Sequence, residues 1–383
     1  MSVNIQHPHH SRRTGEKTSY TAMSFSDRVA ELAIERDIAL GDGAIANIAM
    51  LEKHWSEVEF ELKFEITERC DLNCSFCHQG FGQKNGRGRD FPIDSYRDII
   101  VAAKGERPIK YIRITGGEPT LHQHVGIFLR YAVEAGFHTV LNTNVAHLTP
   151  ERIAELVPYV GTWKVSLPAA DQAGVDAVTG VPGTWHEKIA ALEMLCRLKC
   201  NVDLLIVMTP PNIDDIPKFL AIAEKYGTTC SFLRQESSAS NRRPLTREHI
   251  EQMLPILEKT QSQLGLALPF CVTGDMDRVA SLADGRIICG PYSSLVVKAD
   301  GTVHHCYSRR IHHPVENGFI NTAIHLAAED FVSLPRKCRE CAYGAVCLGG
   351  CRCGFALWNS PVGPIDYLAD FEHKHIYPSG ERG

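Results

Sequence analysis

The sequence predicts an α/β fold in which a partial (β/α)6 TIM barrel is followed by a cysteine-rich C-terminal extension. First, six β-rich apolar runs alternate with amphipathic helical stretches between residues 58 and 236. Second, six strand–helix repeats are too few to close an eight-stranded barrel, so the parallel sheet should stay open. Third, the sequence pattern changes after residue 271, where segments rich in cysteine and glycine replace the periodic apolar segments.

Each element follows from its local pattern. The predicted strands are rich in β-branched and aromatic residues and cover 58–67, 109–115, 138–144, 162–167, 202–209 and 229–236. Apolar residues at helical spacing predict helices over 95–105, 124–136, 149–160, 185–198 and 213–227. Several of these stretches end at glycine, as helix C-termini prefer. In such folds the chemistry lies at the carboxyl ends of the strands.

Four regions are expected along the chain. Residues 1–57 form an N-terminal tail with a short segment of at most two helices, and residues 58–236 form the barrel. Residues 237–270 are a connector with one helix, and 271–383 form the cysteine-rich region. Within that last region, Asp300-Gly301 predicts the turn of a β-hairpin. The loop 337–354 cannot bury a core of its own and should need inorganic cross-links.

Composition excludes several classes of function. The chain has 383 residues and a formal net charge of -5, which gives no reason to expect a nucleic-acid or membrane partner. The N-terminus has no apolar stretch typical of a secretory signal. The 14 cysteines are clustered, which favours metal or iron–sulfur ligation in a reducing compartment over disulfides. We therefore expect a cytoplasmic protein.

Three cysteines follow the first predicted strand at close spacing. Cys70, Cys74 and Cys77 fall within eight positions of the loop at its carboxyl end. Three thiolates can hold three irons of a cubane cluster and leave the fourth iron open. An open coordination position is what a catalytic metal needs. The missing fourth ligand therefore predicts that another molecule binds there.

The spacing Cys70-x3-Cys74-x2-Cys77, with Phe76 before the last cysteine, resembles the signature of the radical S-adenosylmethionine (radical SAM) enzymes. This resemblance implies a [4Fe-4S] cluster whose open iron binds S-adenosylmethionine. It implies reductive cleavage of S-adenosylmethionine to a 5′-deoxyadenosyl radical, which abstracts a substrate hydrogen. The cofactor carries this chemistry, and the protein positions it and excludes water.

The ends of the later strands extend the resemblance. The second strand ends in Gly116-Gly117-Glu118-Pro119, where the family has a motif that contacts the S-adenosylmethionine amino group. Glycines let a backbone approach a ligand closely, and a carboxylate suits an ammonium. Weaker matches imply further cofactor contacts at Asn142, Asn144, Ser166 and Arg234. Thr179-Gly180 and Gly183-Thr184-Trp185 are similar to the molybdenum-cofactor cyclase branch of the superfamily.

The C-terminal cysteines resemble the SPASM extension of radical SAM enzymes, which carries two auxiliary clusters. The resemblance assigns the nearer cluster to Cys289, Cys306 and Cys351. It assigns the farther one to Cys338, Cys341 and Cys347, with Cys353 as its last ligand. The fourth position of the nearer cluster is open, or is filled by Cys271, His304, His305 or an acidic residue. The alternative is a zinc site built from Cys338, Cys341, Cys347 and Cys351.

Three residues are candidates for the catalytic chemistry itself. Cys230, at the start of the sixth strand, and Cys271, at the domain junction, could each donate a hydrogen atom to a substrate radical. Asp275 could accept the proton released when a radical is oxidised. The alternatives are structural cysteines and a solvated acidic turn.

The resemblance implies oxidation, cross-linking or rearrangement of a natural-product precursor. A ribosomally made peptide is the preferred substrate, and a small molecule such as an aminoglycoside or sugar is the alternative. An electron donor such as flavodoxin or ferredoxin is the expected partner. The rival of another class is a non-catalytic iron–sulfur carrier or zinc scaffold. The Gly-Gly-Glu-Pro stretch argues against that rival, because a carrier has no use for an aminocarboxylate site.

Overall fold

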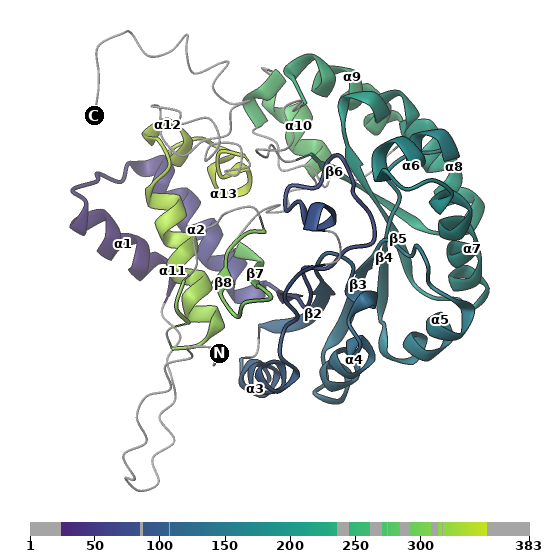
Figure 1. Cartoon of the computed structure of the whole chain (residues 1–383). Coiled ribbons are helices and arrows are strands. Elements are labelled where there is room, and N and C mark those ends of the chain that lie inside the picture. Colours follow the sequence, from purple (N-terminus) through teal and green to yellow (C-terminus); the bar gives the residue numbers. More distant parts are fainter. Residues whose placement is uncertain are drawn as a thin grey trace, which may run out of the picture.

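A curved sheet with helices around its outer side dominates the computed structural model (Figure 1). The structure describes residues 24–84, 87–106, 108–235, 245–260, 270–273, 275–283, 292–307, 313–315 and 317–350. None of the helices in these ranges is long and apolar enough to cross a membrane.

All six predicted barrel strands are present and parallel. They are β1 (Phe60–Glu65), β2 (Ile109–Thr115), β3 (His138–Thr143), β4 (Thr162–Ser166), β5 (Val202–Met208) and β6 (Thr229–Arg234). Each strand pairs with the next along the chain, and the sheet runs β6-β5-β4-β3-β2-β1. β6 and β1 do not pair with each other, so the barrel is open as predicted.

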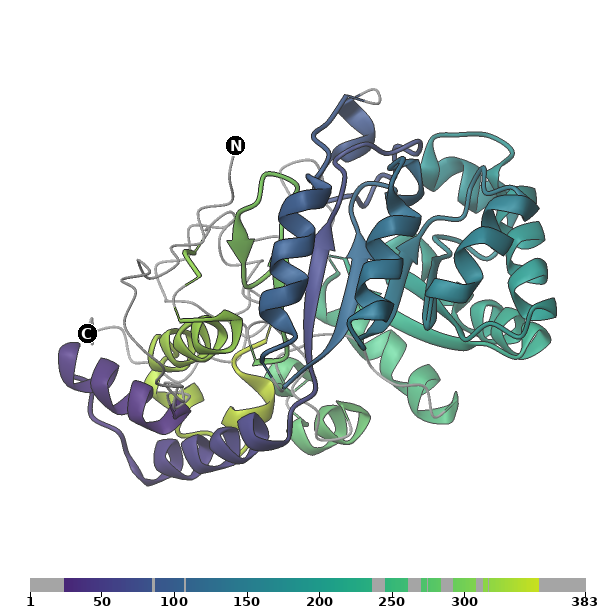
Figure 2. The same ribbon diagram turned by 90° about the horizontal axis from the view of Figure 1, so that it is seen from below.

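Helices cover the convex side of this sheet (Figures 1 and 2). The five predicted ones are α3 (Ile93–Ala103), α4 (Val125–Glu134), α5 (Pro150–Leu156), α7 (Thr184–Arg197) and α8 (Ile216–Tyr226). A sixth helix, α6 (Gln172–Thr179), was not predicted. Short 3-10 segments lie at η1 (Phe81–Lys84), η2 (Pro119–Leu121), η3 (Val157–Tyr159), η4 (Pro210–Asp215) and η5 (Phe270–Thr273).

The two faces of the sheet differ in chemistry, as β1 illustrates. Phe60, Leu62 and Phe64 are fully buried and belong to the hydrophobic core. Because side chains alternate along a strand, Glu61 and Glu65 lie on the opposite, concave face. Both are held in ion pairs there. The concave face of the open barrel is therefore lined with paired charges.

The predicted hairpin is confirmed, and it extends the barrel sheet. β7 (Ser294–Val297) pairs antiparallel with β8 (Val303–His304). Gly301 in the turn has a φ of 84°, a conformation that favours glycine. β7 also pairs in parallel with β1, so the sheet continues to β7-β8 at that edge.

A second group of helices gathers on the hairpin side of the sheet (Figure 1). It contains α1 (Phe25–Glu35), α2 (Asp42–Glu57), α11 (Phe319–Val332), α12 (Arg336–Arg339) and α13 (Gly344–Cys347), with α9 (Arg247–Thr260) and α10 (Met276–Ala283) nearer the barrel. α11 was not predicted, because it is apolar on nearly every side. The predicted division of the chain into four regions at residues 57, 236 and 270 stays a prediction. The regions are not spatially separate, because β7 of the last region continues the barrel sheet and the N-terminal helices pack against C-terminal ones.

Candidate active site

The loop that carries Cys70, Cys74 and Cys77 leaves the carboxyl end of β1 and is tied to the end of α6. Asn73 N donates to Thr179 O at 2.9 Å, and Ser75 N donates to Val178 O at 2.9 Å. Helix α6 then stops at Gly180, which has a φ of 67°. The Thr179-Gly180 pair noted in the sequence thus supports the cysteine loop.

The glycine turn after β2 lies directly against the same loop. Gly117 N donates to Thr67 O at 2.8 Å, and Glu118 N donates to Arg69 O at 2.8 Å. A Cβ at Gly117 would lie 2.2 Å from Arg69 O, and one at Gly116, whose φ is 151°, would lie 2.4 Å from Thr67 O. Both glycines are therefore required for this close approach of two strand ends.

Glu118 ties the end of β2 to the end of β3. Its carboxylate is 1% exposed and accepts hydrogen bonds from Thr120 Oγ1 at 2.6 Å, Thr143 Oγ1 at 2.9 Å and Asn144 N at 2.6 Å. Burial raises the pKa of Glu118, and the hydrogen bonds from Asn144 and Thr120 lower it only in part. The predicted cofactor carboxylate is thus also a structural brace.

The end of β3 completes the contact with the cysteine loop. Asn144 Nδ2 donates to Asp71 Oδ1 at 2.7 Å, one residue after Cys70. Asn142 Oδ1 is buried without a hydrogen-bond partner. Asn142 pairs in register with Lys164, whose ammonium is bonded to Asp203 on the concave face. Asn142 therefore offers an unused acceptor on that face.

Lys188, on α7, is a site residue that sequence reasoning missed. Its side chain is 1% exposed, and its Nζ donates to Asn144 O and, at 3.3 Å, to Ser166 O. Burial lowers the pKa of Lys188, while nearby negative groups, Cys74 first among them, raise it. The sequence signal was a lysine in line with the apolar residues Ala191 and Leu195 of the same helix face.

The thiols of the loop suit a metal cluster and not free thiolates. Burial raises the pKa of Cys70 to about 12 and that of Cys74 to about 11. A thiolate there needs a bound cation, which a cluster supplies. Within the described ranges, no three His, Cys, Asp or Glu side chains converge on one metal position as they stand.

The remaining predicted cofactor residues lie at the same edge of the sheet. Ser166 ends β4, and Arg234 ends β6 with 8% of its surface exposed. The carboxyl ends of parallel strands share one edge. Residues from β1, β2, β3, β4 and β6 are thus brought to one side of the barrel, as the sequence predicted.

The three predicted catalytic residues are placed differently. Phe232 packs edge-on against Phe219 of α8, so Cys230, two positions earlier, is on the helix-covered face and packs against the core. Asp275 is exposed and accepts a hydrogen bond from Arg278 N at the start of α10. These placements favour the structural alternatives for both residues. Cys271 lies in η5, and its side chain is outside the described part of the chain.

Of the predicted auxiliary ligands, Cys306 follows β8, and Cys338, Cys341 and Cys347 lie on α12, α13 and the turn between them. Backbone N–H groups point at two of these sulfurs. Phe270 N donates to Cys347 Sγ at 3.4 Å, and Tyr343 N donates to Cys341 Sγ at 3.5 Å. Cys289, Cys351 and Cys353 lie outside the described residues.

Four residues form a polar bridge between the first cysteine loop and the segment after Cys306. Gln79 Nε2 donates to Glu65 Oε1 at 2.9 Å and to Tyr307 O at 3.0 Å. Lys298 Nζ donates to the same two acceptors, at 2.8 and 2.9 Å. This bridge was not predicted, because its members come from four separate parts of the sequence.

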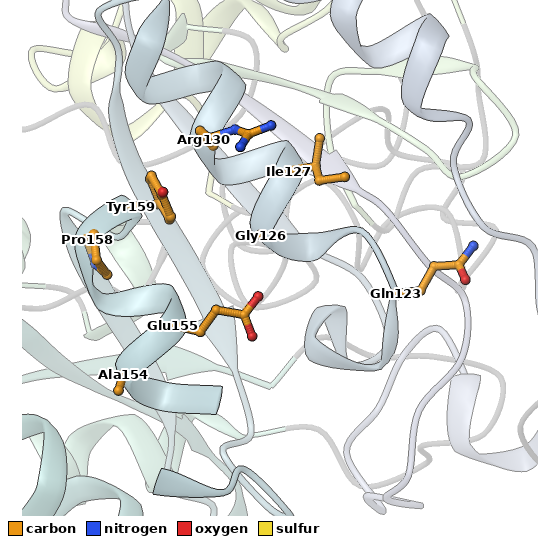
Figure 3. A pocket seen from close by; sticks show the side chains of 8 residues that line it. All are labelled: Gln123, Gly126, Ile127, Arg130, Ala154, Glu155, Pro158 and Tyr159. Atoms are coloured by element: carbon orange, nitrogen blue, oxygen red, sulfur yellow. The ribbon is translucent and has the colours of Figure 1, made fainter. Parts of the chain in front are cut away.

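A hollow outside the barrel does not belong to this site (Figure 3). It lies between α4 and the α5–η3 segment and is lined by Gln123, Gly126, Ile127, Arg130, Ala154, Glu155, Pro158 and Tyr159. None of these is a predicted site residue, and we assign it no role in the chemistry.

Comparison with known proteins gives the following matches. Residues 64–223 match the family model described as the radical SAM superfamily. The mycofactocin maturase MftC of Mycolicibacterium smegmatis is 30% identical over 180 residues, which cover 46% of this chain and 45% of the relative. The PqqA peptide cyclase of Rhodopseudomonas palustris is 24% identical over 334 residues, which cover 80% of this chain and 87% of the relative. The chain thus spans less than half of MftC but most of the cyclase.

The fold match extends beyond the barrel. The crystal structure of Streptococcus suis SuiB bound to S-adenosylmethionine superposes with a TM-score of 0.63 at 17% identity. The match covers 90% of this chain and 88% of SuiB. The part of the chain that matches the radical SAM superfamily model, residues 64–223, contains the cysteine loop and the glycine turn that packs against it.

Proposed function

We propose that this protein is an enzyme that reductively cleaves S-adenosylmethionine and removes a hydrogen atom from a ribosomally made peptide precursor. The observation that carries the proposal is the contact between the loop of Cys70, Cys74 and Cys77 and the turn at Gly117-Glu118. These two segments, the proposed cluster and cofactor sites, are bonded to each other at the carboxyl edge of the sheet.

The residues present fit the cofactors. Three half-buried thiols would supply the ligands of a [4Fe-4S] cluster, and Asn142 Oδ1 is a buried acceptor that lacks a partner. The glycine turn leaves backbone exposed to a small ligand. When bound, the cluster and S-adenosylmethionine would supply a 5′-deoxyadenosyl radical as the hydrogen-abstracting species.

The chain's own residues then bind and orient. Glu118 lies beside the loop, and its carboxyl group suits the ammonium of S-adenosylmethionine. Ser166 and Arg234 at the neighbouring strand ends are proposed to contact the rest of the cofactor. Lys188 holds the ends of β3 and β4 through their carbonyls and places a buried cation near the cysteine loop.

We propose that the C-terminal region is a SPASM extension with auxiliary clusters. Cys306, Cys338, Cys341 and Cys347, together with Cys289, Cys351 and Cys353, are the proposed ligands. The N–H groups that point at the sulfurs of Cys341 and Cys347 support ligation there. A flavodoxin or ferredoxin is the proposed electron donor, and the cytoplasm the proposed compartment, since such clusters need a reducing environment.

The peptide substrate is supported by the names of the relatives. One is a maturase and another a peptide cyclase, and SuiB has also been solved with a precursor peptide bound. Oxidation, cross-linking and rearrangement of a peptide all start with the same hydrogen abstraction. A small-molecule substrate is the alternative.

The first test is chemical. Anaerobically reconstituted protein, reduced with dithionite, should convert S-adenosylmethionine to 5′-deoxyadenosine and hold about twelve irons per chain. A variant with Cys70, Cys74 and Cys77 replaced by alanine should hold about eight irons and make no 5′-deoxyadenosine. Iron-replete wild type that leaves S-adenosylmethionine intact would remove the enzyme proposal and favour a carrier. About four irons with bound zinc would remove the auxiliary clusters.

The second test identifies the substrate class. Extract from cells grown in deuterated medium is separated into a peptide fraction and a small-molecule fraction, and each is incubated with the enzyme. Deuterium in 5′-deoxyadenosine from the peptide fraction alone supports the proposal. Deuterium from the small-molecule fraction alone contradicts it and selects the alternative.

A further inference from the structure

Helix α2 is attached to the cysteine segment 338–347 by one buried side chain. Asn47 is 3% exposed. Its Nδ2 donates to Arg339 O at 2.8 Å and to Cys341 O at 2.9 Å. Its Oδ1 accepts from Ala345 N at 3.1 Å. A single amide therefore bonds to the backbone on both sides of the turn between Cys341 and Cys347.

The two segments approach as closely as the backbone allows. A Cβ at Gly344 would lie 2.4 Å from Asn47 Nδ2, and one at Gly43 would lie 2.4 Å from Glu340 O. Neither glycine has a φ in the left-handed range. Glycine is therefore needed at these two positions to leave room for the contact, and not for an unusual backbone conformation. The fit is thus built from both partners, one near each end of the chain.

The cysteine segment is also held from its other side. The Arg339 guanidinium is 9% exposed and donates to Val332 O at 3.0 Å, at the end of α11. Phe25 of α1 packs edge-on against Phe331, with ring centroids 6.2 Å apart. The N-terminal helices and α11 therefore pack together beside the cysteine segment (Figure 1).

We propose that Asn47 is a positioning residue for the auxiliary cluster held by Cys338, Cys341 and Cys347. This inference rests on the proposed function, which supplies the cluster. Three cysteines can ligate one cluster only if the backbone between them keeps a fixed path, and Asn47 fixes three points of that path. The N-terminal helices are accordingly part of the cluster site, although they precede the barrel in sequence.

The chain offers a matched control in Asn212. It is 5% exposed, and its Nδ2 donates to Pro168 O at 3.3 Å and Val207 O at 3.0 Å. Its Oδ1 accepts from Thr209 N at 2.8 Å. This is the same three-bond arrangement, located in the barrel. Aspartate at either position keeps the shape but turns a carboxylate oxygen toward two carbonyls.

The test compares Asn47→Asp and Asn212→Asp in the full chain after anaerobic reconstitution. For Asn47→Asp we expect a loss of about four of about twelve irons. We also expect an altered auxiliary signal in electron paramagnetic resonance, and alkylation of Cys338, Cys341 and Cys347 by iodoacetamide, read by mass spectrometry. The first cluster and S-adenosylmethionine binding should persist, which shows that the barrel is folded. Asn212→Asp should keep all irons and the wild-type signal.

Three results would overturn the inference. Asn47→Asp could retain the iron, the signal and the thiol protection of wild type. Both variants could lose the same irons, which would reduce Asn47 to a general stability residue. Iodoacetamide could alkylate Cys338, Cys341 and Cys347 in reconstituted wild type. These cysteines would then hold no auxiliary cluster, and the role proposed for Asn47 would be wrong as well. Only this last result removes the auxiliary part of the proposed function.

Discussion

Replacing Lys298 with methionine should destabilise the fold through the polar bridge. Lys298 Nζ lies 2.8 Å from Glu65 Oε1, and the two side chains are 13% and 5% exposed. Methionine fills the space of the lysine stem but removes the ammonium. Glu65 is then left as a buried carboxylate whose remaining side-chain donor is Gln79.

The expected magnitude follows from this burial. Removing one partner of a buried ion pair costs about 3–5 kcal/mol, because the other charge stays desolvated. For a cooperative unit of 150–250 residues, each kcal/mol lowers the melting temperature by about 2–4 °C. We therefore expect Lys298→Met to melt roughly 6–20 °C below wild type. The double variant Glu65→Gln/Lys298→Met should recover most of this loss, since neither member of the pair is left as an unpaired buried charge.

The loss should also depend on pH. Burial raises the pKa of Glu65 above the ordinary value for a glutamate, and the ion pair with Lys298 opposes that rise. Without the lysine the pKa rises further, so Glu65 can take up a proton in the folded state at mildly acidic pH. A carboxyl group whose pKa is higher in the folded than in the unfolded protein destabilises the fold. The destabilisation is complete at pH values above the folded-state pKa and absent at pH values below the unfolded-state pKa. The deficit of Lys298→Met should thus shrink as the pH falls.

The assay is the melting temperature of anaerobically reconstituted protein across the pH range in which the clusters are intact. Two outcomes would refute the reasoning. One is a single variant that melts within about 2 °C of wild type, which would mean that solvent reaches the bridge. The other is a double variant as unstable as the single one, which would show that the loss comes from packing and not from the unpaired charge.

Three further predictions concern the cofactor site. Gly117→Ala would bring a methyl group within 2.2 Å of Arg69 O, so the first cluster should lose most of its iron. Gly126→Ala is the control and should keep the iron, because its new methyl group would come no closer than 3.5 Å to another atom, Glu155 Oε1. Glu118→Gln should weaken S-adenosylmethionine binding about tenfold or more, measured by equilibrium dialysis, because a charge-assisted bond to the ammonium is lost; unchanged affinity would leave Glu118 as a brace alone. Lys188→Met should lower the midpoint potential of the first cluster, measured by potentiometric titration with paramagnetic resonance, because a buried cation that favours the reduced state is gone. An unchanged potential would limit Lys188 to its two carbonyl contacts.

Parts of the fold were readable because their signals are local. The run IKYIRIT predicted a strand over 109–115, and β2 has those bounds. The strand ends then placed the cysteine loop, the glycine turn and Asn142 at one edge, because parallel strands share their direction. The turn at Asp300-Gly301 was likewise carried by two adjacent residues.

Other parts were hidden because their signals are not periodic. α11 is apolar on nearly all sides, and an all-round apolar segment does not reveal whether it is a helix or a strand. Cys230 looked like a candidate hydrogen donor until the partner of Phe232 showed which face of β6 it occupies. A single-residue shift in a strand reverses the face, and only packing decides it.

The sequence by itself determined the strand–helix order, the open barrel and the three thiols beside a glycine turn. Only the tertiary structure decided which distant residues meet. Lys298 reaches Glu65 across 233 positions, and Asn47 reaches Cys341 across 294. The physical reason is range. Backbone conformation and side-chain periodicity are set by neighbours in the chain, whereas hydrogen bonds and ion pairs between distant segments form only after the sheet brings those segments together.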